Sequence, residues 1–123
     1  MIIVRFELDE ERGTLTLRVN GHAGAAKAGE DTVCASATIL AYTLAQTMKI
    51  DRTAGRLRYE PKIRLREGDA VVSVRPRAEW MRDVLTEWYV VMNGYLLLAH
   101  NYAKYVTLDT EKFVSLEEEA KEE

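Results

Sequence analysis

The chain has 123 residues, a length that fits one domain able to bury a core of its own. Hydrophobic residues make up 47% and charged residues 30%, which is the balance of a soluble globular protein and excludes a disordered or membrane-embedded one. The net charge of −3 lacks the clustered basic excess of nucleic-acid-binding domains, so we expect no direct nucleic-acid partner.

The N-terminal sequence and the cysteine count bear on the cellular compartment. Residues 1–8 are followed at once by the charged residues 9–12, which is not the pattern of a secretory signal peptide. No apolar run is long enough to span a bilayer. We therefore expect a cytoplasmic protein without membrane contact, whose single cysteine stays reduced. One cysteine and two histidines are too few for a structural zinc site, so we expect no metal and no cofactor.

The first predicted elements are two strands. Hydrophobic and polar residues alternate in residues 2–8 and again in residues 14–19, which predicts strands with one buried face each. The turn-forming residues between them end in Gly13 and predict an antiparallel hairpin. Residues 20–31 hold three glycines and no bulky apolar side chain, which predicts a mobile loop.

A helix is predicted next. Apolar residues recur at intervals of three and four from Val33 to Met48, and the pattern ends near Asp51. Asp31 directly precedes the pattern and is a candidate N-cap, whose carboxylate would accept bonds from the free N–H groups of the first turn. This boundary predicts that Cys34 lies in the first helical turn.

Two more strands and a long helix follow. Residues 57–65 and 70–74 predict strands joined by a turn at residues 67–69, with Pro61 interrupting the first. Pro76 marks the start of a helix expected to run to about residue 102. Its two adjacent apolar stripes fit a wide core helix or a core helix with a two-fold subunit interface equally well, and Gly94 indicates close packing.

The order of these elements predicts the fold. A last short strand is expected at residues 105–108, after the series strand–strand–helix–strand–strand–helix. This series predicts an α+β fold, a two-layer sandwich with a mixed or antiparallel sheet of four to five strands and two main helices. We expect a single domain at residues 1–110 and an acidic, flexible tail at residues 111–123.

Two reactive residue types bracket the glycine-rich loop. His22 follows the second strand and Cys34 lies near the start of the first helix, so a short loop can bring them together. Free N–H groups at a helix start favour a thiolate and can stabilise an oxyanion, and a nearby imidazole activates the thiol further. The helix residues nearest the nucleophile are expected around the substrate or the oxyanion: Ala35, Ser36 and Thr38.

Spacing alone favours less specific interpretations. A lone cysteine on a helix is more often a small buried hydrophobe than a nucleophile. Asp31 is more simply a helix cap than a third catalytic residue that orients His22. Core packing is the favoured role of the aromatic residues Trp80, Trp88 and Tyr89.

Two short stretches around the loop form a longer pattern: Gly21-His22-Ala23-Gly24 and Gly29-Glu30-Asp31-Thr32-Val33-Cys34-Ala35. They closely resemble the signature of the Prp-like family of ribosomal-processing cysteine proteases. The element order matches this family over about residues 1–108, and Thr38 stands where the family has a serine, which keeps the hydroxyl.

The resemblance implies a function and a site. The catalytic pair would be His22 and Cys34, and the remaining motif residues would form the supporting loop: Gly21, Gly24, Gly29 and Asp31. The family implies a homodimeric cysteine endopeptidase that removes a short N-terminal extension from a large-subunit ribosomal protein through a thioester intermediate. The alternative is a non-catalytic ribosome-associated or assembly factor that retains the fold, for which the basic residues between positions 49 and 82 are the main support.

Overall fold

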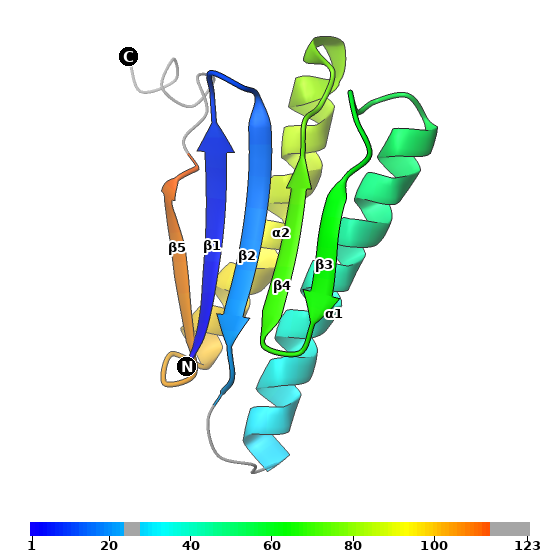
Figure 1. The fold of residues 1–123 in the computed structure, drawn as a ribbon. Coiled ribbons are helices and arrows are strands. Elements are labelled where there is room, and N and C mark those ends of the chain that lie inside the picture. Colours follow the sequence, from blue (N-terminus) through cyan, green and yellow to red (C-terminus); the bar gives the residue numbers. More distant parts are fainter. Residues whose placement is uncertain (24–27, 114–123) are drawn as a thin grey trace.

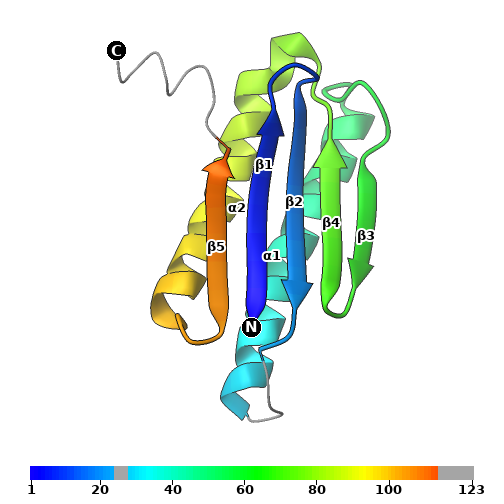
Figure 2. The ribbon, with the colours of Figure 1, turned by 60° about the vertical axis from the view of Figure 1, so that its left-hand side comes forward.

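The computed structural model describes residues 1–23 and 28–113, and for residues 28–31 the backbone alone. The described elements are, in chain order, β1 (Ile2–Asp9), β2 (Thr14–Gly21), α1 (Ala28–Thr53), β3 (Lys62–Arg66), β4 (Asp69–Val74), the 3-10 helix η1 (Ala78–Trp80), α2 (Met81–Asn101) and β5 (Val106–Lys112). Both α-helices cover the same face of the sheet (Figures 1 and 2), so the predicted two-layer α+β fold is confirmed.

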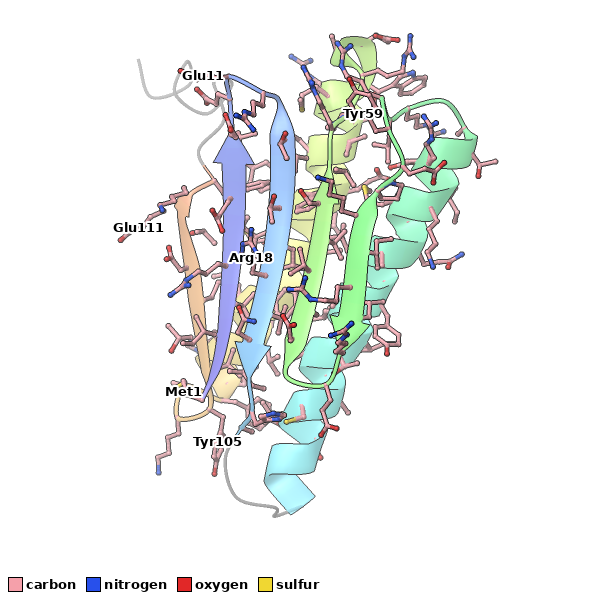
Figure 3. The ribbon with its side chains drawn as sticks, viewed as in Figure 1. Met1, Glu11, Arg18, Tyr59, Tyr105 and Glu111 are labelled. Atoms are coloured by element: carbon pink, nitrogen blue, oxygen red, sulfur yellow. The ribbon has the colours of Figure 1, made fainter. Side chains whose placement is uncertain are left out.

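The five strands form one mixed sheet in the order β3-β4-β2-β1-β5. The pairs β1–β2, β2–β4 and β3–β4 are antiparallel, whereas β5 lies parallel to β1 with Ile2 opposite Val106. The face away from the helices carries polar side chains such as Arg18 (Figure 3), whose Nε donates to a Glu7 carboxylate oxygen at 3.2 Å. The alternation predicted for β1 and β2 follows from this arrangement, because only one face of the sheet meets the helices.

The strand predicted at residues 57–65 is shorter than expected. Regular pairing starts at Lys62, directly after Pro61, and Leu57 forms only an isolated bridge with Pro76. A proline has no N–H group to donate to a neighbouring strand, which explains why the ladder begins after it.

Aromatic rings fill the core beside α2. The Phe6 ring meets Trp88 at 6.1 Å, Tyr95 at 5.8 Å and Phe113 at 5.7 Å, each edge to face, measured between ring centroids. Trp88 is therefore a core residue, as predicted. Because β5 runs to Lys112 and Phe113 is buried, the expected tail boundary at residue 111 is wrong, and residues 111–113 belong to the domain. The rest of that tail, residues 114–123, lies outside the described residues.

Helix α1 begins earlier than the sequence pattern indicates. It starts at Ala28, so Asp31 lies inside the helix and its interpretation as the N-cap is wrong. Alanine and glutamate are strong helix formers, which explains why Ala28 and Glu30 extend the helix beyond the amphipathic stretch. The apolar face predicted for this helix is buried: Val33, Ala37, Ala41, Leu44 and Met48.

Both predicted stripes of helix α2 contribute to the core. Seven of their members are buried, whereas Leu96 of one stripe is exposed: Val84, Leu85, Trp88, Val91, Met92, Tyr95 and Leu98 are the buried ones. A Cβ built on Gly94 would lie 2.6 Å from the Leu40 Cδ2 atom, which confirms close packing of the two helices at this glycine. Neither helix in the described part of the chain has a stretch apolar enough to cross a bilayer.

A buried cluster of ionisable groups joins the helices at the end opposite the loop. The Asp51 side chain of α1 is fully buried and accepts a hydrogen bond from Arg56 Nη1 at 2.8 Å. The Glu87 carboxyl of α2 neighbours Asp51. Burial and the neighbouring Asp51 carboxylate raise the pKa of Glu87 from 4.5 to about 8. Among the described residues no donor reaches Asp51 Oδ2 or Glu87 Oε1. A proton that Glu87 keeps at neutral pH supplies a donor for a hydrogen bond between the two carboxyl groups.

This cluster predicts that the protein loses stability as pH rises from 4.5 to about 8. The folded state keeps the Glu87 proton that the unfolded chain releases near pH 4.5, so this contribution is complete below pH 4.5 and is lost as pH rises through about 8. The variant Glu87→Gln keeps a donor that does not titrate. We expect the free energy of unfolding of the wild type to fall between about pH 6 and about pH 9. The fall for Glu87→Gln should be smaller by about 1–3 kcal/mol, and urea unfolding measures both.

The matched control is Glu10→Gln, in the exposed turn between β1 and β2. Its pH dependence should equal that of the wild type. A Glu87→Gln profile that also follows the wild type would rule out the shared proton.

Candidate active site

A pocket of about 460 Å³ opens where the end of β2 and the turn between β3 and β4 face helix α1. This volume lies in the range of sites for small ligands or peptide side chains. His22 lines the pocket from the end of β2, and Cys34 lines it from α1. The two residues that sequence analysis predicts to act together thus border one cavity.

The backbone around His22 is held by both neighbouring segments. Gly21 has φ +97°, and a Cβ at this position would overlap the Met1 carbonyl oxygen, so only glycine fits. The Gly21 N–H donates to the Gly68 carbonyl at 2.9 Å, and the Met1 amine donates to the His22 carbonyl. Met1 lies at the lower end of the sheet in Figure 3. The backbone of His22 is therefore anchored between β1 and the β3–β4 turn.

Cys34 is the seventh residue of α1, so its expected place in the first helical turn is wrong. Its side chain is partly buried. Inside an α-helix each N–H donates to the carbonyl four residues earlier, and only the first four N–H groups stay free. The N–H groups of Cys34 and Ala35 are thus engaged in the helix, and the dipole effect of the helix start is weak this far along. The imidazole in the same pocket becomes the main candidate for activating the thiol.

The neighbours of Cys34 on α1 differ in their orientation. Ala35 and Thr38 line the pocket, and no hydrogen bond of the Thr38 hydroxyl is found among the described residues. Ser36 is not part of the lining, and its hydroxyl donates to the Thr32 carbonyl at 2.8 Å. Residues four apart share a helix face whereas residues two apart do not, which explains why Thr38 accompanies Cys34 and Ser36 does not.

One wall of the pocket consists of residues that the sequence does not mark as part of a site. The turn between β3 and β4 contributes Arg66, Glu67, Gly68 and Asp69. Its sequence indicates only a turn, and no local signal shows that this turn faces His22, because the contact depends on the pairing of β2 with β4.

The structure describes the surroundings of three other motif residues only in part or not at all. Gly24 lies outside the described residues. Gly29 and Asp31 lie in the first turn of α1, and their side-chain surroundings are outside the described part of the chain. The hypothesis that Asp31 orients His22 stays a prediction.

No group of three or more histidine, cysteine, aspartate or glutamate side chains suited to a metal ion occurs among the described residues. The pocket brings together a thiol, an imidazole and a hydroxyl, from Cys34, His22 and Thr38, beside the charged side chains of the β3–β4 turn.

Solved structures with the same fold include proteases. The essential ribosomal processing protease Prp from S. aureus, in complex with a substrate peptide, has 17% sequence identity and a TM-score of 0.64, with 90% of this chain and all (100%) of that chain covered. The same protease with a covalently linked product peptide gives 18% identity and a TM-score of 0.63, at coverages of 90% and 100%. The Streptococcus mutans protein SMU.848 gives 22% identity and a TM-score of 0.62, at coverages of 89% and 93%. At these identities the likeness shows the fold.

The fold and the pocket define a small α+β domain in which one thiol and one imidazole share a cavity. A family model described as cysteine protease Prp matches residues 1–107. The chain therefore belongs to the Prp cysteine protease family, as the resemblance in its sequence predicts. Among curated proteins no sequence matches this chain.

Proposed function

We propose that this protein is a cysteine endopeptidase in which Cys34 is the nucleophile and His22 is the base. The observation that carries the proposal is that these two side chains, from different elements, line one pocket in a member of a cysteine protease family. Cys34 is the single cysteine of the chain, so a thiol mechanism has one candidate nucleophile.

The reaction proceeds in two steps. The His22 imidazole takes the proton of the Cys34 thiol, and the sulfur attacks the carbonyl carbon of the scissile peptide bond. The C–N bond breaks, His22 returns the proton to the leaving amine, and the acyl group stays on Cys34 as a thioester. Water, deprotonated by His22, then hydrolyses the thioester and releases the acid and the free thiol.

A donor is needed for the oxyanion that forms in each step. The N–H groups of Cys34 and Ala35 are engaged in α1, whereas the Thr38 hydroxyl borders the pocket one helical turn from the sulfur. We therefore assign the Thr38 hydroxyl to the oxyanion or to the adjacent substrate carbonyl.

The proposed substrate is an N-terminal extension of a large-subunit ribosomal protein, cleaved in the cytoplasm. This substrate is supported by the description of S. aureus Prp as a ribosomal processing protease that binds a substrate peptide. The apolar side chains that line the pocket suit hydrophobic side chains of such a peptide: Ile2, Val19, Ala37 and Ala41.

The alternative of a non-catalytic ribosome-associated factor is supported by fewer unpaired cations than the sequence indicates. Within the basic segment, four of the ten cations each pair with a carboxylate: Arg52 with Glu60, Arg56 with Asp51, Arg64 with Asp69 and Arg77 with Glu79. Paired guanidinium groups attract polyanions less strongly than free ones, so the segment is weaker as a nucleic-acid surface than its sequence indicates.

The first prediction concerns the proposed pair. We expect Cys34→Ala to abolish cleavage of a peptide that carries the ribosomal-protein extension, and His22→Ala to lower kcat at least about 10³-fold. Mass spectrometry follows the products, and circular dichroism checks the fold. The control is His100→Ala, at the exposed end of α2, which should cleave like the wild type. Full activity of Cys34→Ala would refute the proposed function.

A second prediction tests the Thr38 hydroxyl. The variant Thr38→Val keeps the shape of the side chain but removes the donor, and we expect kcat to fall on the order of 100-fold with little change in KM. Thr53→Val is the control, because the Thr53 hydroxyl donates to the Lys49 carbonyl at 3.2 Å at the other end of α1. Equal kcat values for the two variants would remove Thr38 from the mechanism.

A homodimer is part of the proposal. Large apolar side chains are exposed on both helices: Ile39 (61%) and Ile50 (55%) on α1, and Val90 (65%) and Leu97 (65%) on α2. A second copy of the chain would remove these side chains from water, which matches the homodimer implied by the family resemblance.

We expect light scattering after size exclusion to give a dimer for the wild type and a monomer for Leu97→Glu. The control Tyr59→Glu changes an equally exposed residue between α1 and β3 (Figure 3) and should stay dimeric. A monomeric wild type would contradict the dimer without affecting the proposed chemistry.

A further inference from the structure

The imidazole of His22 lies directly against the backbone of Gly68. A Cβ atom built on Gly68 would come within 2.5 Å of His22 Nε2, 2.7 Å of Cε1 and 3.3 Å of Cδ2. Contacts below about 3 Å do not occur between such atoms, so any side chain at this position must displace the ring. The absence of a side chain at residue 68 thus permits the imidazole to lie against the turn.

The same glycine also holds the backbone next to His22. Its carbonyl accepts the Gly21 N–H at 2.9 Å, one residue before His22. Gly68 of the β3–β4 turn therefore contacts both the backbone next to His22 and the His22 ring.

The turn that carries Gly68 is itself tied down. Asp69 receives two hydrogen bonds from the Arg64 guanidinium, at 2.9 and 3.1 Å, and one from Asn20 Nδ2 at 3.3 Å. Arg64 belongs to β3 and Asn20 to β2, so the bonds join the turn to both neighbouring strands. A turn fixed in this way can act as a rigid wall for the ring that rests on it.

We propose that Gly68 is a positioning residue that sets the orientation of the His22 imidazole toward Cys34. The inference rests on the proposed function, in which His22 is the base. Because proton transfer and attack depend on alignment, a displacement of the ring by about 1 Å should lower kcat while substrate binding changes little.

A suitable test must separate ring displacement from backbone strain. Gly68 has φ +74°, so alanine is strained there whatever its contacts. Gly55, between α1 and β3, has φ +78°, and a Cβ there would meet nothing within 4 Å. Gly55→Ala therefore adds the same kind of backbone strain without touching the site.

The experiment compares Gly68→Ala with Gly55→Ala in the full chain. Three quantities are measured: kcat and KM for peptide cleavage, the pH profile of Cys34 alkylation by iodoacetamide, and the urea midpoint of unfolding. We expect Gly68→Ala to lower kcat about 10- to 100-fold with KM within about twofold, and to shift the alkylation profile toward that of His22→Ala. Gly55→Ala should keep the kcat and the alkylation profile of the wild type.

If Gly68→Ala does not fold, Gly68→Asn and Gly55→Asn replace the pair, because asparagine tolerates positive φ better and still carries a Cβ. A folded Gly68 variant with wild-type kcat and a wild-type alkylation profile would overturn the positioning role. Wild-type cleavage by His22→Ala would instead overturn the proposed function, so the two failures are distinguishable.

Discussion

The close approach of α1 to the sheet is the constraint on which the site depends. Alanines at positions 37, 41 and 45 form much of the buried helix face and let the helix backbone lie near the strands. The buried Tyr95 hydroxyl of α2 donates to the Ala37 carbonyl at 2.8 Å, and burial raises the pKa of this hydroxyl, which keeps it protonated as a donor. This bond fixes α1 one turn beyond Cys34. A larger residue at these alanines would push the thiol away from the end of β2.

The histidine side of the pocket is built by different contacts. The end of β2 is held between β1, through Met1, and the β3–β4 turn, through Gly68. Neither contact involves α1, so the thiol and the imidazole are positioned by two independent parts of the core. A site assembled in this way depends on contacts from distant parts of the domain.

The position of Cys34 in the second turn of α1 changes the electrostatic argument. A cysteine at a helix start would gain from free N–H groups and from the helix dipole, but both effects fade after the first turn. In the proposed mechanism the chemistry then depends on side chains around the pocket, with His22 proposed to move the proton and Thr38 to stabilise the oxyanion. Small residues such as Ala35 and Gly68 border the space between these groups.

Local patterns in the sequence predicted much of the fold and placed two candidate residues that line one pocket. Alternation and helical periodicity report burial within one element. They therefore suffice to predict the first two strands, both helices and a mixed or antiparallel sheet. The motif around His22 and Cys34 identified the family because its residues are close in sequence. Sequence patterns are less reliable at boundaries: the pattern predicts a helix cap at Asp31, whereas the helix begins at Ala28.

The sequence by itself therefore determined the class of fold, the family and the candidate nucleophile and base. Only the tertiary structure decided that β5 returns parallel to β1, that Phe113 is buried in the core, and that the His22 imidazole lies against Gly68. These features join residues far apart in the chain, and no local periodicity encodes which strands become neighbours. The physical reason is that burial of apolar surface, summed over the whole domain, selects the strand order, and the strand order then selects the residues that meet in the pocket.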